Sequence, residues 1–155
     1  MPAATKIQTM QFHPCVLPIS TRFHNAITKQ VQQASLDYYS DTLTINFRDT
    51  SYNAEAGGYH PVEIMIRNEG DKWRLCYITD FAYSGGVYPE LAIELDFNIE
   101  SNTFRQMFLS PCALAHREVK SFYRTWEGNF LEYLSDGVFD QIKVTKSSKE
   151  SKFPF

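Results

Sequence analysis

The chain has 155 residues, 43% of them apolar and 15% aromatic, and a formal net charge of −3. This length fits one domain that can bury a sizeable core, and the composition excludes an intrinsically disordered chain. Its three cysteines, Cys15, Cys76 and Cys112, are odd in number and form no CxxC pair. This number and spacing exclude a disulfide framework and a zinc ribbon. We expect the three cysteines to be small buried apolar side chains.

Charge is unevenly distributed along the sequence. From Asp37 to Glu100 there are 12 acidic and four basic residues, whereas residues 143–155 hold four lysines and one glutamate. An acidic surface repels phosphate backbones, which argues against nucleic acid as a partner of the main body. A short lysine-rich end is typical of a solvated tail.

The amino-terminal segment lacks the charged start and the apolar run of a secretory signal. No stretch approaches the roughly 18 apolar residues of a membrane helix. We therefore expect a cytoplasmic protein that does not bind membranes. We further expect an irregular segment over 1–18, a single domain over 19–145 and a flexible basic tail over 146–155.

A helix is predicted over residues 20–35. Ser20 is a suitable N-cap, because its hydroxyl can accept a hydrogen bond from a free amide of the first turn. Phe23, Ile27 and Val31 follow at helical spacing, with polar residues between them. This pattern predicts an amphipathic helix with one face on a core.

The central part of the chain changes to a period of two, which predicts strands with one buried face. In one of these segments Trp73, Leu75 and Tyr77 alternate with Cys76, Ile78 and Asp80, which predicts two opposite faces. Short connections such as Asn68-Glu69-Gly70-Asp71 favour antiparallel neighbours. The predicted strands are 43–47, 62–67, 73–81, 91–97, 104–109 and 138–144.

A second helix is predicted to begin near Ser110-Pro111, because proline in the first turn loses no hydrogen bond. A wide apolar stripe from Val119 to Leu134 follows, and Asp136-Gly137 ends the helix. In this position Cys112 would lie at the start of a helix, where a thiolate is favoured, which leaves a catalytic thiol as an alternative. The wide stripe also favours a homo-oligomer. The predicted fold class is α+β, an antiparallel β-sheet meander flanked by an N-terminal and a C-terminal helix.

Two connections, 49–61 and 82–90, are rich in tyrosine, acid and glycine. In a meander, alternate connections lie at the same end of the sheet. We therefore expect both of these connections at one end. Tyrosine supplies rigid contact area, which is typical of a binding surface. Alternatively, the tyrosines pack these loops down, and Asp49 and Asp80 bond turn amides. The candidate binding residues are Asp49, Tyr52, Tyr59, His60, Asp80, Tyr83, Tyr88 and Glu90.

No catalytic residue, cofactor or metal site is predicted. The sequence has no recognisable Ser/His/Asp order and no glycine-rich phosphate loop. His60 and Glu63 are three positions apart on a predicted strand, so they point to opposite faces and do not form a metal site.

Two functions remain open. The first is a non-catalytic interaction module that uses this acidic, tyrosine-rich sheet end to bind an unidentified protein partner. The alternative is a small-molecule-binding protein or an enzyme with a site between the 49–61 and 82–90 loops. In that case His60 or Asp80 would carry a proton and Tyr59 would orient the ligand.

Several runs of this sequence resemble the bacterial family catalogued as domain of unknown function 2787. The resemblance covers roughly residues 16–145 and implies the fold of the mitochondrial acidic matrix protein, a twisted antiparallel sheet with helices at both ends of the chain. It implies no activity or site. The mitochondrial relatives are acidic, ring-forming binders of many partners, whereas this chain is shorter, less acidic and ends in a basic tail. The runs are Leu17-Pro18-Ile19-Ser20, Ile45-Asn46-Phe47-Arg48-Asp49, Gly58-Tyr59-His60-Pro61-Val62-Glu63-Ile64, Tyr77-Ile78-Thr79-Asp80-Phe81, Tyr88-Pro89-Glu90-Leu91 and Glu94-Leu95-Asp96-Phe97.

Overall fold

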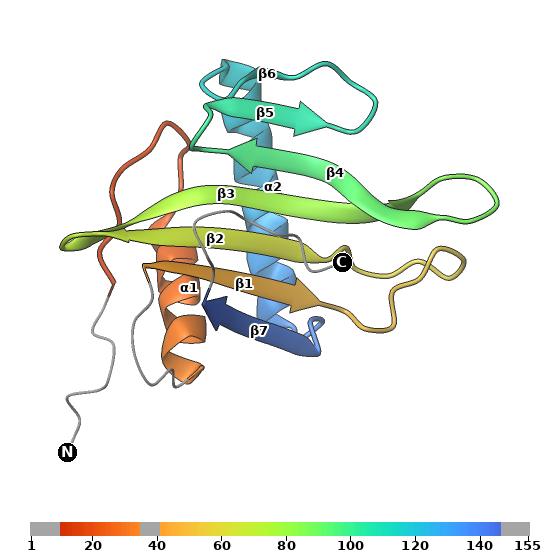
Figure 1. The fold of residues 1–155 in the computed structure, drawn as a ribbon, viewed down its shortest axis with the longest axis horizontal. Helices are drawn as coiled ribbons and strands as arrows, with labels where there is room; N and C mark the ends of the chain where they lie inside the picture. The colour runs from red at the N-terminus through yellow and green to blue at the C-terminus, as the bar shows by residue number, and fades with distance from the viewer. Residues whose placement is uncertain (1–9, 35–40, 147–155) are drawn as a thin grey trace.

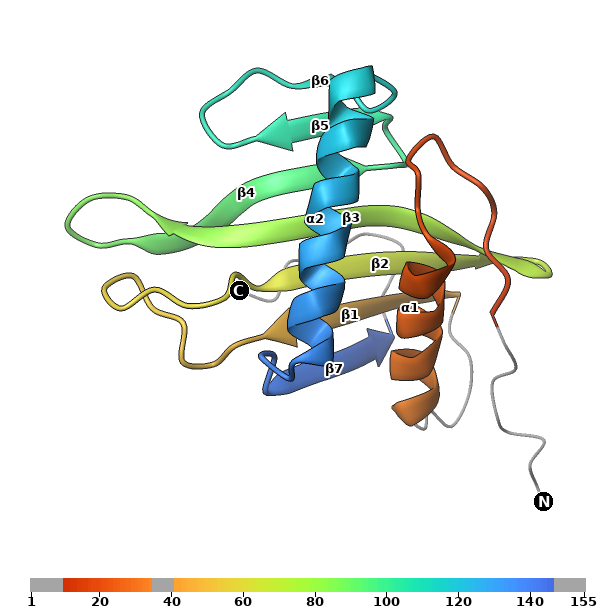
Figure 2. The same ribbon diagram turned by 180° about the vertical axis from the view of Figure 1, so that it is seen from behind.

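The structure is a computed structural model that describes residues 10–34 and 41–146. Within these ranges, two helices cover one face of a seven-stranded antiparallel sheet (Figures 1 and 2). The strand order is β6-β5-β4-β3-β2-β1-β7. This architecture confirms the predicted α+β class. The elements are α1 (Thr21–Gln33), β1 (Thr42–Arg48), β2 (Val62–Glu69), β3 (Lys72–Ser84), β4 (Glu90–Asn98), β5 (Thr103–Gln106), β6 (Cys112–Ala113), α2 (Arg117–Ser135) and β7 (Gln141–Lys146).

Helix α1 begins and packs as its sequence predicts. The Ser20 hydroxyl accepts a hydrogen bond from the Phe23 amide at 3.1 Å, and Phe23, Ile27 and Val31 are fully buried. Figure 2 shows α1 beside α2, nearer to the β2–β3 turn. Neither of the two helices in the described ranges is long and apolar enough to cross a membrane.

The strands β1 to β5 form the predicted meander, β6 extends it by pairing with β5, and β7 joins it after α2 by pairing with β1. The predicted 68–71 hairpin is present, with Gly70 at a φ of 82°. Before α1, Phe12 forms a bridge to Trp73 and Leu17 is buried. Residues 1–9 of the predicted irregular segment and residues 147–155 of the predicted tail lie outside the described residues.

A β-bulge in β3 corrects the predicted alternation of that strand. Met65 pairs with Tyr77 and Ile66 pairs with Leu75, so Cys76 is an extra residue on β3. The extra residue shifts the side-chain period by one. As a result Ile78 joins Leu75 in the core beneath the helices, whereas Cys76 and Tyr77 form a separate buried cluster with Met65. The predicted faces are therefore wrong from Tyr77 onward.

Helix α2 begins at Arg117, and its predicted start at Ser110-Pro111 is wrong. Cys112 pairs instead with Phe104 of β5, which holds the segment after Pro111 extended. His116 is the N-cap and accepts a hydrogen bond from the Glu118 amide at 3.1 Å. Cys112 is exposed in β6 rather than buried or adjacent to a helix, so the geometry expected for an activated thiol is missing.

Gly128 lies within α2 without a packing reason. A Cβ at this position would have no heavy atom within 4 Å among the described residues. Gly128→Ala is therefore expected to raise the free energy of unfolding by about 1 kcal/mol, because alanine is the better helix former. Urea unfolding followed by circular dichroism measures the change. An unchanged or lower midpoint would show that this position has a role that glycine alone fills.

Candidate functional site

The connection between β1 and β2 is organised by one carboxylate. Asp49 Oδ1 accepts a hydrogen bond from the Ser51 amide and Oδ2 accepts one from the Tyr59 amide, both at 3.0 Å. These bonds, with the Ser51 hydroxyl bond as the largest cause, hold the pKa of Asp49 below its usual value. Gly58 has a φ of 142°, and a Cβ there would lie 2.9 Å from Asp49 Oδ2. The loop conformation therefore requires glycine, and it fixes the backbone next to Tyr59 and His60.

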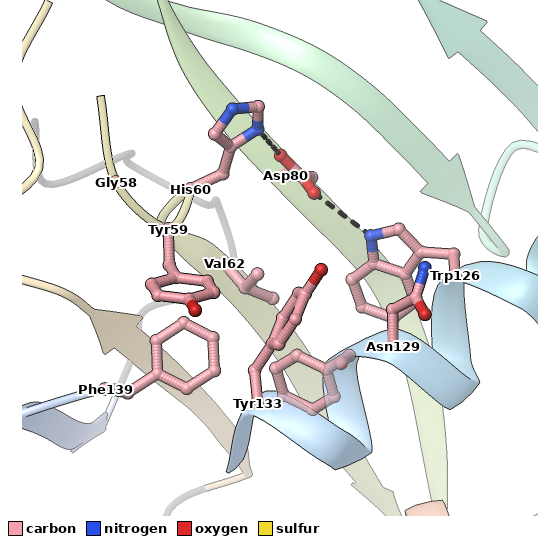
Figure 3. Close-up of a pocket in the computed structure, with 10 residues that line it drawn as sticks. Gly58, Tyr59, His60, Val62, Asp80, Trp126, Asn129, Tyr133 and Phe139 are labelled. Atoms are coloured by element: carbon pink, nitrogen blue, oxygen red, sulfur yellow. Dashed lines mark hydrogen bonds and ion pairs between the residues drawn. The ribbon is translucent and has the colours of Figure 1, made fainter. Parts of the chain in front are cut away.

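Asp80 joins the loop, the sheet and the second helix (Figure 3). His60 Nδ1 lies 2.9 Å from Asp80 Oδ1, and Trp126 Nε1 donates to Asp80 Oδ2 at 3.0 Å. The Asp80 side chain is 13% exposed and Trp126 is 8% exposed, so their contact is shielded from water, whereas the His60 side chain is 39% exposed. Because Asp80 follows the β3 bulge, its side chain lies on the helix-covered face and reaches α2.

A cavity of about 300 Å³ lies beside this cluster. It is bounded by residues 58–62 on one side and by α2 on the other. Tyr59 and Tyr133 meet edge to face with ring centroids 4.8 Å apart, and their exposed fractions of 40% and 37% place them at the mouth. The described lining residues are Gly58, Tyr59, His60, Val62, Asp80, Trp126, Asn129, Phe130, Tyr133 and Phe139.

The cavity combines apolar walls with very few charges. Of the described residues that line it, none is lysine or arginine. The hydrogen bond to Asp80 raises the pKa of His60, and this effect exceeds the opposing effect of partial burial. In the described ranges no group of three His, Cys, Asp or Glu residues could hold a metal ion. The arrangement suits a small ligand with a large apolar surface.

Four of the sequence-predicted residues come together. The Tyr52 hydroxyl accepts a hydrogen bond from the Tyr83 amide at 3.0 Å, and the Tyr52 ring lies 5.1 Å from the Tyr83 ring and 5.4 Å from the His60 ring, centroid to centroid. His60 in turn contacts Asp80. Tyr52 and Tyr83 thus pack the two connections together, as the alternative interpretation of the tyrosines expects.

The other predicted residues have separate positions. Asp49 supports its own loop, and Tyr59 faces α2 across the cavity. Tyr88 and Glu90 are exposed at the far end of the β3–β4 hairpin, away from the described lining. The cavity therefore lies between residues 58–62 and α2, and not between the 49–61 and 82–90 loops.

Sequence reasoning missed the contribution of α2 and of the segment after it. Trp126, Asn129 and Tyr133 line the cavity from α2, and Phe139 lines it from the turn before β7. The helical spacing of Trp126 and Tyr133 predicted only that both belong to the apolar stripe of this helix. A buried indole N–H usually has a hydrogen-bond partner, and this was the one signal in the sequence that Trp126 needs an acceptor such as Asp80.

The contact between His60 and Asp80 predicts a measurable titration. The pKa of His60 is raised in the folded state. The contact therefore stabilises the fold fully at a pH below the unfolded-state pKa of about 6.5, and this contribution is lost as pH rises through the folded-state pKa. Asp80→Asn is expected to move the pKa of His60 down. Imidazole NMR signals followed against pH measure both values. Equal pKa values in the two proteins would contradict the assigned contact.

Comparisons with known proteins agree with this fold. The family described as a protein of unknown function, DUF2787, matches residues 21–145. Two solved structures from Vibrio cholerae are similar over nearly their whole length. Hypothetical protein VC0508 of the VSP-II pathogenicity island is 36% identical, with a TM-score of 0.79, and the match covers 87% of this chain and 99% of that one.

Conserved hypothetical protein VC1805 of pathogenicity island VPI-2 is 38% identical, with a TM-score of 0.77 and coverage of 86% of this chain and 99% of that one. It is described as sharing structural homology with the human P32 protein, the mitochondrial acidic matrix protein. No curated protein matches this sequence. The family resemblance predicted from the sequence runs is confirmed.

Proposed function

Because the chain belongs to the DUF2787 family of proteins of unknown function, its role has to be inferred from its own geometry, and we propose that it binds a small organic molecule. The observation that carries this proposal is the cavity beside the His60–Asp80–Trp126 cluster. Its volume of about 300 Å³ is at the lower end of the range of ligand sites. The ligand is therefore small, or only part of a larger molecule enters.

The fixed geometry of the walls supports the proposal. Asp49 holds the 58–60 backbone, and Asp80 holds the imidazole of His60 and the indole of Trp126. A site that is already ordered loses little conformational entropy when a ligand binds. The lining offers aromatic surface and a few polar groups at its edge, which is the usual composition of a small-molecule site.

Native mass spectrometry of protein purified gently from its own host tests the proposal. The wild type is expected to carry a small-molecule adduct that Asn129→Trp lacks, because Asn129 is exposed on α2 and an indole there would fill the cavity. Thr125→Trp is the matched control, since Thr125 is exposed on the same helix and does not belong to the described lining. An adduct retained by Asn129→Trp would place the ligand elsewhere, and an adduct-free wild type would count against the proposal.

A second candidate function, protein interaction, is favoured by exposed apolar residues at the end of the sheet that carries the β1–β2 loop. Val87 and Tyr88 in the β3–β4 connection are 84% and 85% exposed, and Phe108 and Leu109 in the β5–β6 connection are 90% and 63% exposed. Both connections extend past the sheet on the side of the β1–β2 loop (Figure 1). Phe108 has a φ of 69°, an unusual backbone conformation for an exposed aromatic residue.

Crosslinking followed by affinity purification tests this second candidate. A partner captured by the wild type is expected to be lost from the double variant Tyr88→Ser/Phe108→Ser. It is expected to be retained by Val16→Ser, which removes an exposed apolar side chain elsewhere. Equal capture by all three proteins would show that these two connections are not the interface.

A further inference from the structure

We propose that the ligand of the cavity carries an alkylated ammonium group. This inference rests on the proposed small-molecule function and names the ligand chemistry. It follows from two features of the site: aromatic rings predominate in its walls, and its one fixed charge, on Asp80, is negative. An alkylated ammonium is attracted both to the faces of aromatic rings and to a nearby carboxylate.

Aromatic side chains make up half of the described lining. Five of its ten residues are Phe, Tyr or Trp. The Trp126 ring is stacked on Phe130 with an interplanar angle of 7°, so one of its faces is used within the protein. Tyr59 and Tyr133 at the mouth retain exposed surface. The tyrosines are therefore the rings that a bound cation would meet first.

The charges around the cavity favour a cation over an anion. The described lining has no lysine or arginine, so nothing there attracts a phosphate or carboxylate except His60 when it is protonated. Asp80 contacts that histidine directly, and Glu94 on β4 adds a further negative charge within its electrostatic reach. In Figure 3 the second ring nitrogen of His60 points away from the aromatic side chains. The imidazole does not present that donor to a ligand among the rings.

The hydrogen bonds of Asp80 select among cations. Its two oxygens accept from His60 and from Trp126, so neither is without a partner. A primary ammonium brings three N–H donors that all need acceptors, and its burial here would leave some of them unpaired. A quaternary ammonium has no donors. Its methyl groups can contact the rings while its charge stays near the Asp80 carboxylate.

Protonation of His60 should oppose cation binding. The charged and titratable groups around this imidazole are Asp80 of β3, Glu94 of β4 and the Tyr52 hydroxyl of the β1–β2 loop. With His60 protonated, its charge offsets that of Asp80, and with His60 neutral the Asp80 charge is uncompensated. Cation affinity is therefore expected to increase as pH rises through the pKa of His60.

Three matched probes test the inference by isothermal titration calorimetry. They are choline, its uncharged isostere 3,3-dimethylbutan-1-ol and the primary amine ethanolamine. Choline is expected to bind about tenfold more tightly than either of the others, which corresponds to about 1.4 kcal/mol and lies within the range of cation–π interactions. Tyr133→Leu is expected to remove this preference, whereas Tyr133→Phe, which keeps the ring, is expected to retain it.

The outcomes separate this inference from the proposed function. Equal binding of choline and its isostere would show an apolar cavity without cation selectivity. Choline binding that is unchanged in Tyr133→Leu would show that the ring of Tyr133 does not hold the cation. Either result overturns the inference and leaves small-molecule binding intact. If none of the three probes binds while mass spectrometry shows a cavity adduct, the inference fails and small-molecule binding stands. A choline affinity that falls as pH rises would contradict the assigned role of His60.

Discussion

Replacing Glu127 with alanine is expected to lower the free energy of unfolding by about 3 kcal/mol, because a buried hydroxyl and a partly buried amide lose a charged acceptor. Glu127 Oε2 accepts from the Tyr123 hydroxyl at 2.8 Å and from the Ser20 amide at 3.0 Å. Tyr123 is fully buried and burial raises its pKa, so its hydroxyl keeps its proton and remains a donor. The Glu127 carboxylate also lies at the N-terminus of α1, where negative charge is favourable.

Urea unfolding with a double-mutant cycle measures this effect. Glu132→Ala is the matched control on the exposed side of α2 and is expected to change stability by less than about 0.5 kcal/mol. In a Tyr123→Phe background the substitution of Glu127 should be less harmful, because one of the two donors is then absent. A loss below about 1 kcal/mol for Glu127→Ala would show that this contact does not join the two helices.

Asp80→Ala is expected to lower the free energy of unfolding by about 2 kcal/mol, since it leaves the indole N–H of Trp126 buried without its acceptor. Trp126 is 8% exposed, so water replaces the lost contact poorly. The same substitution releases the imidazole of His60 and is expected to weaken ligand binding as well. Stability is measured by urea unfolding, and the environment of the indole by tryptophan fluorescence.

Two variants make the Asp80 prediction specific. Glu90→Ala removes an exposed carboxylate from β4, outside the described lining, and is expected to change neither stability nor ligand binding. In a Trp126→Phe background Asp80→Ala should cost less, because no indole N–H is left unpaired. If the two substitutions were additive, the Asp80–Trp126 hydrogen bond would contribute nothing to stability.

Most of the fold is predictable from local patterns. Alternation identified β1, β2 and β4, and the short turn at Gly70 predicted the antiparallel pairing of β2 with β3. The bulge at Cys76 was not predictable, because Leu75, Cys76 and Tyr77 are all apolar and the pattern fits either face. The start of α2 failed for a related reason. Ser110-Pro111 is a local helix signal, but pairing of Cys112 with Phe104 is a long-range contact that overrides it.

The candidate site was predictable only in part. The meander places the 49–61 loop and the end of β3 together, and this brought His60 and Asp80 into one candidate group. The contact of Asp80 with Trp126 spans 46 positions and depends on how α2 crosses the sheet. The periodicity of a sequence does not predict which strand residue a given helix residue will face. The β3 bulge, also invisible in the pattern, decides that Asp80 points toward α2.

The most direct test of the central claim is two-dimensional NMR of ¹⁵N-labelled protein titrated with a library of small aromatic and ammonium fragments. Binding is predicted to shift the signals of the Trp126 indole, His60 and Tyr133 in the wild type and in Thr125→Trp, and to leave Asn129→Trp unchanged. Fragments that shift the β3–β4 and β5–β6 connections instead, or that shift Asn129→Trp equally, would contradict a ligand site between residues 58–62 and α2.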